Sequence, residues 1–250
     1  DWISVGEVDH AVRDFFHRLD QGEDFTKCPG FWIRDGDTIH RNDIAQLVDL
    51  DDIPFRDFHT QDDKFHVEAG KVIQGDPFIT NPEYTILASR GCPYWTCTFC
   101  SNTLTRPLYD GKGKQFRVRS VESIIQEMEY AKKLCTNIRV VRFDDEVFPI
   151  RNDWINEFKE KWPKRVGIPF EVLVDPRMVK PKPLQDLKEA GLRALCMGIQ
   201  ANGRVSKEFY NRNVSNEDIV AAQTVFREVG IRANLQIIWD DPYSTEQDKD

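Results

Sequence analysis

From residue 83 onward the chain alternates strand-like and helix-like segments, and this alternation restricts the possible folds more than any other feature. Apolar runs rich in β-branched and aromatic residues predict strands at residues 84–89, 138–143, 168–174, 194–199 and 231–239. The segments between them carry apolar residues at helical spacing. Helix starts are marked by Ser120, Pro183 and Ser215, and helix ends by Gly191 and Gly230.

Repeated strand–helix units predict a parallel α/β sheet with right-handed crossovers. Such a sheet is either doubly wound or a β/α barrel. In both architectures ligands bind beyond the carboxyl ends of the strands. The residues that directly follow each predicted strand are therefore the first candidates for a functional site.

The N-terminal part has a different organisation. Residues 1–5 are typical of a strand, residues 7–19 show a helical apolar stripe, and residues 31–42 contain Asp35-Gly36 between two short runs, which indicates a hairpin. Residues 43–80 are acidic and lack periodicity. We therefore expect the end of a doubly wound α/β domain plus a hairpin at 1–42, a linker at 43–80, and a barrel at 81–250.

The chain has no initiator methionine, and the predicted barrel ends after its fifth strand. We expect an internal fragment of a longer protein, with a barrel that is incomplete at its C-terminal end.

The composition excludes several classes of partner. The formal net charge of −8 argues against general binding to nucleic acid or to anionic membranes. No apolar run has the length of a membrane span, and no signal peptide is evident. Residues 106–119 are an exception, with five Lys or Arg and one acid. This segment is either a solvated loop or a loop that meets an anionic substrate or partner.

Three of the six cysteines lie within nine residues, directly after the first predicted strand of the alternating region: Cys92, Cys97 and Cys100. The other three are scattered among apolar neighbours, and we expect them to be buried: Cys28, Cys135 and Cys196. This placement does not indicate a disulfide framework. We therefore expect a reducing compartment, the cytoplasm.

Three thiolates on one tight loop can converge on a single metal centre. A structural zinc site uses four ligands, and no further Cys or His lies near this loop in the sequence. Three thiolates suit a 4Fe-4S cluster that keeps one iron open to another ligand. The alternatives are a zinc knuckle completed by a distant ligand and a chance grouping.

The cysteine segment resembles the cluster loop of radical S-adenosylmethionine (SAM) enzymes. In that family an aromatic residue precedes the last cysteine and packs near the adenine, and Phe99 stands at this position. The resemblance extends over residues 80–250 and implies a partial, TIM-like β/α barrel. One departure is that four residues, 93–96, separate the first two cysteines, where the family usually has three.

The resemblance also implies SAM contacts on the later strands. Asp144 and Asp145 follow the second strand, where the family contacts the amino group of SAM, although either acid could instead cap a helix or be solvated. Arg177, after the third strand, could meet the SAM carboxylate or a substrate, or could have only a surface role. Gln200 lies in a fourth-strand segment that resembles one where the family approaches SAM, and Ile238 lies in a fifth-strand segment that resembles one whose apolar residue flanks the adenine.

The N-terminal part resembles the end of a cobalamin-binding domain and its linker, in Val5-Gly6-Glu7, Pro29-Gly30 and residues 50–55. This implies a cobalamin-dependent radical SAM enzyme, with cobalamin bound mainly by sequence upstream of this chain.

The implied reaction is reductive cleavage of SAM at a reduced cluster, followed by radical chemistry on a small molecule. The subfamily suggests methyl transfer or a related rearrangement, with a reductant such as flavodoxin or ferredoxin. The alternatives are a methylthiotransferase-like enzyme that modifies RNA and a non-catalytic metal-binding module.

Overall fold

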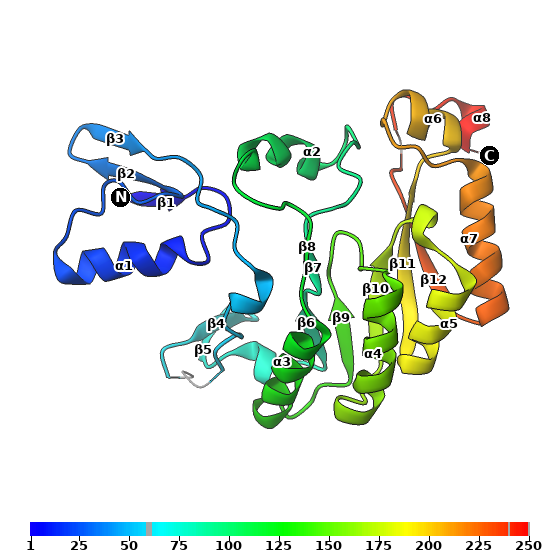
Figure 1. The fold of residues 1–250 in the computed structure, drawn as a ribbon, viewed down its shortest axis with the longest axis horizontal. Helices are drawn as coiled ribbons and strands as arrows, with labels where there is room; N and C mark the ends of the chain where they lie inside the picture. Colours follow the sequence, from blue (N-terminus) through cyan, green and yellow to red (C-terminus); the bar gives the residue numbers. More distant parts are fainter. Residues whose placement is uncertain (59–61, 240, 250) are drawn as a thin grey trace.

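The computed structural model describes residues 1–58, 62–239 and 241–249 of the 250-residue chain. Its main element is a five-stranded sheet in the order β12-β11-β10-β9-β6, with every neighbouring pair parallel (Figure 1). The strands are β6 (Glu83–Ile86), β9 (Val140–Phe143), β10 (Phe170–Val174), β11 (Leu192–Gln200) and β12 (Arg232–Ile237).

The order of the strands distinguishes between the two architectures that the sequence leaves open. The spatial order follows the chain order without reversal, as in a barrel, whereas a doubly wound sheet reverses direction. The connecting helices run alongside the strands in Figure 1: α3 (Val121–Leu134), α4 (Asn152–Arg165), α5 (Pro181–Ala190) and α7 (Asn216–Val229). The expectation of a partial β/α barrel is confirmed.

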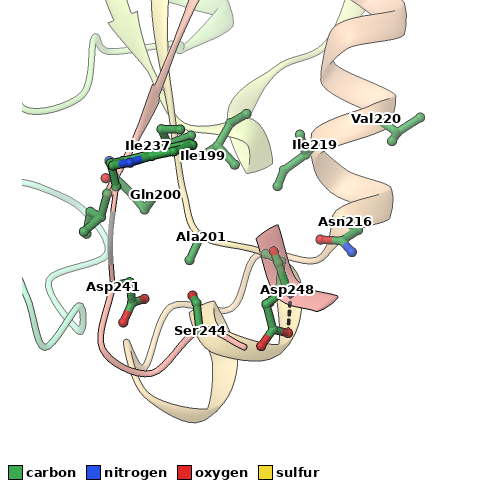
Figure 2. Close-up of a pocket in the computed structure, with 13 residues that line it drawn as sticks. Ile199, Gln200, Ala201, Asn216, Ile219, Val220, Ile237, Asp241, Ser244 and Asp248 are labelled. Atoms are coloured by element: carbon green, nitrogen blue, oxygen red, sulfur yellow. Dashed lines mark hydrogen bonds between the residues drawn. The ribbon is translucent and has the colours of Figure 1, made fainter. Parts of the chain in front are cut away.

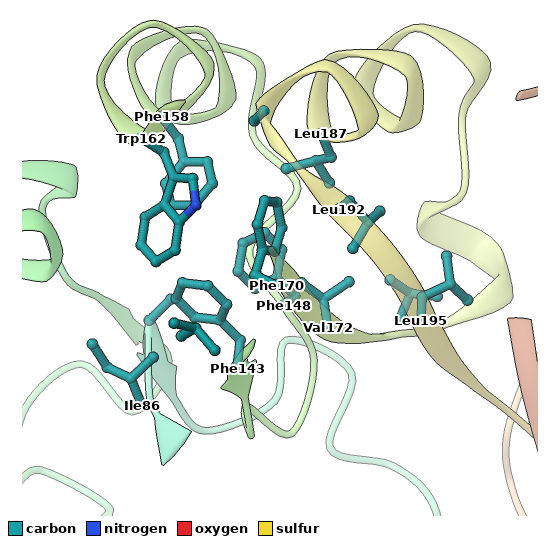
Figure 3. Close-up of a cluster of buried hydrophobic side chains, with 14 of the residues drawn as sticks. Ile86, Phe143, Phe148, Phe158, Trp162, Phe170, Val172, Leu187, Leu192 and Leu195 are labelled. Carbon is teal, nitrogen blue, oxygen red and sulfur yellow. The ribbon is translucent and has the colours of Figure 1, made fainter. Parts of the chain in front are cut away.

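An aromatic core holds the sheet and the helices together (Figure 3). Phe143 and Phe170 from the strands meet Phe158 and Trp162 from α4, and all four side chains are fully buried. The rings of Phe158 and Trp162 stack with centroids 4.8 Å apart, and Phe143 meets Phe170 edge-on at 5.8 Å. Burial of this apolar area is the main stabilising contribution to the barrel.

The helix boundaries follow the signals in the sequence. The Ser120 side chain accepts a hydrogen bond from the Ser123 backbone, and Ser215 forms a capping box with Asp218. Gly191 and Gly230 end their helices in the left-handed conformation, which glycine adopts without a steric cost.

The N-terminal residues form a small unit of their own. It contains β1 (Trp2–Ser4), α1 (Ala11–Gln21), β2 (Phe31–Asp35) and β3 (Thr38–Arg41). The predicted strand, helix and hairpin are all present, but β1 pairs antiparallel with β2. Phe15 of α1 stacks on Phe31 at 4.4 Å in a separate apolar cluster. The strand and helix thus bury their apolar faces against the hairpin.

Residues 43–80 contain more structure than the expected linker. A two-stranded hairpin, β4 (Phe65–Glu68) and β5 (Lys71–Gln74), interrupts the segment, and two short 3-10 turns lie at Leu50–Asp52 and Pro77–Ile79. The turn between the strands uses Ala69 and Gly70, both with positive φ. An Ala-Gly pair is not a common hairpin signal, and the sequence therefore did not indicate this hairpin.

Three of the five basic side chains in segment 106–119 form ion pairs with acids of the same chain. At these three positions the segment is therefore neither a solvated loop nor a free surface for an anion. Lys112 binds Asp43, Arg117 binds Glu7 at 2.6 Å, and Arg119 binds Glu127 at 2.6 Å.

Among the residues that the structure describes, no helix has the length and apolar character needed to cross a membrane.

Candidate functional site

The cysteine loop lies beyond the carboxyl end of β6, between β7 (Ser89–Arg90) and α2 (Ser101–Thr105). β7 pairs antiparallel with β8 (Arg117–Val118), which closes the base of the loop. Gly91 begins the loop with φ +84°, and a Cβ there would lie 2.6 Å from the Gln115 carbonyl oxygen. Only glycine allows the two backbones to approach this closely.

All three cysteines of the loop are free thiols and partly buried. The Cys100 amide donates to the Cys97 carbonyl at 3.0 Å. Burial raises the pKa of the Cys97 thiol; the charges of Arg212 and Arg177 oppose this shift, while negative charge on Cys92 and Cys100 adds to it. Cys97 therefore lies close enough to the other two cysteines of the loop to interact with them electrostatically. Cys28 and Cys135 are buried as expected, and Cys196 is only partly so.

The donor set of the loop fits an iron–sulfur cluster. In the described part of the chain, no three His, Cys, Asp or Glu side chains form a group that could hold one metal ion. A cubic cluster with one open iron takes three thiolates from the protein. The three free cysteines of the loop supply this number and type of donor.

The backbone is left-handed at Trp95, one of the four residues between the first two cysteines, with φ +33°. The Thr103 hydroxyl donates to the carbonyls of Trp95 at 3.0 Å and of Cys97 at 2.8 Å. The Arg106 guanidinium lies 4.9 Å from the centroid of the Trp95 ring. The enlarged loop is thus held from its own C-terminal side.

The two acids after β9 occupy different environments. Asp145 is 2% exposed, and its Oδ1 accepts hydrogen bonds from the Ser89 hydroxyl at 2.6 Å and from the Ser89 amide. Burial raises the pKa of Asp145 to about 7, although the Ser89 hydrogen bonds lower it. Asp144 is exposed and pairs with Arg142 at 3.2 Å. Of the two predicted contacts, the structure leaves Asp144 accessible to a ligand.

Arg177 is held against the cysteine loop by an acid that the sequence analysis overlooked. Its guanidinium binds Asp175 at 2.7 Å and lies 3.4 Å from the centroid of the Tyr94 ring. Asp175 also binds Arg212 at 3.0 Å. Asp175 directly follows a predicted strand, a position that could have marked it, whereas no sequence signal marked Arg212.

Gln200 and Ile238 line one cavity of about 540 Å³ at the ends of β11 and β12 (Figure 2). The Ile238 amide donates to the Gln200 carbonyl at 2.8 Å. Phe99 does not line this cavity, but its ring meets Tyr210 edge-on at 4.9 Å.

A second cavity of about 500 Å³ is lined by residues of both the cysteine loop and the N-terminal unit. Its lining includes Glu7, Trp95, Asp144 and Glu146. The structure therefore brings Gln200 and Ile238 to one cavity and Asp144 to another, with the cysteine loop beside the second.

A partial β/α barrel with three free cysteines after its first strand is the arrangement of an iron–sulfur enzyme of the barrel class. The family model of the Radical SAM superfamily matches residues 86–249, and the chain belongs to this superfamily. Membership implies a 4Fe-4S cluster and SAM. No curated protein sequence matches the chain.

Solved structures extend the likeness to the whole chain. The cobalamin-dependent SAM radical enzyme OxsB with aqua-cobalamin bound has a TM-score of 0.74 at 19% identity, over 99% of this chain and 34% of OxsB. The radical SAM methyltransferase TsrM from Kitasatospora setae, with cobalamin and a [4Fe-4S] cluster bound, has a TM-score of 0.68 at 16% identity, over 99% of this chain and 47% of TsrM.

The coproporphyrinogen III oxidase HemN from Escherichia coli, a radical SAM enzyme, has a TM-score of 0.50 at 19% identity and covers 69% of this chain and 40% of its own. By the coverage given above, the chain spans about a third of the length of OxsB and about half of the length of TsrM. At these identities the likeness shows a common fold.

Proposed function

We propose that the chain is the catalytic core of an enzyme that cleaves SAM reductively and starts radical chemistry on a small-molecule substrate. One observation carries this proposal: three free cysteines share a loop at the carboxyl end of the first strand of a partial barrel. We assign Cys92, Cys97 and Cys100 as the cluster ligands. When bound, the cluster supplies the electron for SAM cleavage.

The residues around the loop would position SAM. The accessible Asp144 carboxylate suits the ammonium group of the methionine part, and Arg177 suits its carboxylate. Phe99, Gln200 and Ile238 offer an aromatic face, an amide and an apolar side chain for the adenosine. The buried Asp145 would act on the loop through Ser89 and would not touch SAM.

We further propose cobalamin-dependent methyl transfer or a related rearrangement. The proposal is supported by the likeness to OxsB and TsrM, which covers the N-terminal unit as well as the barrel. Cobalamin would be held mainly by residues outside this chain, and the cavity between the N-terminal unit and the cysteine loop would face it. A low-potential protein such as flavodoxin or ferredoxin would deliver the electron, in the cytoplasm.

The test is the binding of SAM to the anaerobically reconstituted protein, followed by detection of 5′-deoxyadenosine after reduction with dithionite. We expect Asp144→Asn to weaken SAM binding about tenfold without loss of iron, because a hydrogen bond to a charged group contributes about 1.5 kcal/mol. The matched control is Asp153→Asn, an exposed acid on α4 that pairs with Arg151. Equal SAM affinity in the parent and Asp144→Asn would remove Asp144 from the site.

A further inference from the structure

The cysteine loop is hydrogen-bonded to a distant segment, residues 209–211, which precedes α7. The Thr98 amide donates to the Tyr210 carbonyl at 3.0 Å, and the Thr98 hydroxyl donates to the Phe209 carbonyl at 2.7 Å. The Thr96 hydroxyl donates to the Asn211 carbonyl at 3.0 Å, and the Asn211 side chain returns a bond to the Thr96 carbonyl at 3.1 Å. Since Thr96 and Thr98 flank Cys97, this segment fixes the backbone on both sides of that cysteine.

Arg212 attaches the 209–211 segment to the sheet. Its side chain is buried, and its guanidinium donates to the carbonyls of Gly198 and Ile199 at the end of β11, both at 2.7 Å. The same guanidinium also donates a hydrogen bond to the Asp175 carboxylate at 3.0 Å. The position of Cys97 is therefore tied to the ends of β10 and β11 through one buried arginine.

Asp175 also controls the other part of the loop. It accepts two hydrogen bonds from the Arg177 guanidinium, at 2.7 and 2.9 Å, and one from the Arg177 amide at 3.0 Å, and this holds the guanidinium over the ring of Tyr94. Tyr94 lies among the four residues between Cys92 and Cys97. Although burial alone would raise its pKa, the hydrogen bond from Arg177 and the charge of Arg212 lower the pKa of Asp175. One ionised carboxylate thus organises both guanidiniums.

We infer that Asp175 is a positioning residue for the cluster: by holding Arg177 and Arg212, it sets the places that Tyr94 and residues 96–98 take, and with them the spacing of the three cysteines. The loop carries one residue more than the usual spacing, and the contacts from Arg177 and from residues 209–211 restrict it in addition to those from its own C-terminal side. The inference rests on the proposed assignment of Cys92, Cys97 and Cys100 as cluster ligands.

The test compares Asp175→Asn with Asp186→Asn. Asp186 is a matched control, because it is 4% exposed, binds both Lys159 and Lys182, and lies on α5 away from the cysteine loop. Iron and sulfide content, the EPR spectrum of the reduced cluster and the rate of bleaching in air are measured after anaerobic reconstitution. We expect Asp175→Asn to lose at least half of its iron, to change the EPR spectrum and to bleach faster, while Asp186→Asn keeps the parent's values.

A second variant decides the matter if Asp175→Asn does not fold. Tyr94→Leu removes the ring beneath Arg177, and Tyr94 belongs to neither of the buried apolar clusters, so we expect faster bleaching and a changed EPR spectrum with an unchanged unfolding midpoint of the apoprotein. Trp32→Leu, which removes the ring of the remote Arg41–Trp32 pair, is its control.

Parent-like cluster properties in Tyr94→Leu, or equal losses in Asp175→Asn and Asp186→Asn, would overturn the inference and leave the proposed function intact. A parent protein that takes up no iron would overturn both.

Discussion

The cysteine loop can pass close to the Gln115 backbone because Gly91 has no side chain. Gly91→Ala would combine a left-handed backbone with a Cβ 2.6 Å from a backbone oxygen. We expect a loss of about 2 kcal/mol of unfolding free energy and reduced iron uptake, because neither backbone can move without opening the base of the loop. Urea unfolding and iron analysis measure the two effects.

Gly36→Ala provides the control for this prediction. Gly36 also has a positive φ, of +56°, but a Cβ there would meet no atom within 4 Å. It should therefore cost only the backbone strain and leave iron uptake unchanged. Equal losses in the two variants would show that the contact with Gln115 is unimportant.

The raised pKa of Asp145 predicts how the stability of the folded state changes with pH. Because burial raises its pKa from 3.8 to about 7, the folded state retains a proton that the unfolded chain has already released. Its stabilising contribution is complete below about pH 4 and is lost as the pH rises to about 7.

Asp145→Asn does not titrate, so its stability should fall less than that of the parent across this range, by a few kcal/mol in total. Urea unfolding at several pH values measures the difference. Parallel curves for the parent and the variant would contradict the raised pKa.

These two residues show what the sequence could and could not predict at this scale. The position of the cysteines after a strand was visible in their spacing. The sequence could not show that Asp145 turns inward while Asp144 faces solvent, because the choice depends on Ser89, 56 positions away. The link from Asp175 to Arg212 depends likewise on tertiary contacts across 37 positions.

At the scale of elements, the helices and the barrel strands were predictable from periodicity and capping residues, and most boundaries differ by only a few residues. The helix α1 begins at Ala11, later than the predicted residue 7. The residues expected to form its first turn are not helical and form ion pairs with the barrel. Glu7 binds Arg117 and Arg90, and Asp9 also binds Arg90. Such pairs between distant segments leave no local signal.

These ion pairs attach the N-terminal unit to the base of the cysteine loop. Glu7→Ala would leave Arg117, whose side chain is only 9% exposed, without its carboxylate. We expect a loss of about 3 kcal/mol, because an unpaired buried charge is costly, and faster proteolysis in the segment that joins the unit to the barrel.

Asp14→Ala breaks an exposed pair with Arg18 within the same unit and should cost less than about 1 kcal/mol. If Glu7→Ala were as stable and as protease-resistant as Asp14→Ala, the ion pairs would not hold the unit in place.

For the whole molecule, the alternation of strands and helices predicted the fold class but not the winding, since barrels and doubly wound sheets share the same local pattern. The spatial order of the strands provides the distinction. The N-terminal unit is an antiparallel sheet with one helix, and the structures of OxsB and TsrM cover it together with the barrel.

The central claim is that Cys92, Cys97 and Cys100 hold a 4Fe-4S cluster, and the most direct measurement is the iron and sulfide content of the anaerobically reconstituted protein. We predict about four irons per chain, with the brown colour and iron lost when any of these cysteines is changed to Ala. Cys28→Ser, Cys135→Ser and Cys196→Ser should keep both. Stoichiometric zinc without iron uptake, or full iron content in a variant that lacks all three loop cysteines, would contradict the claim.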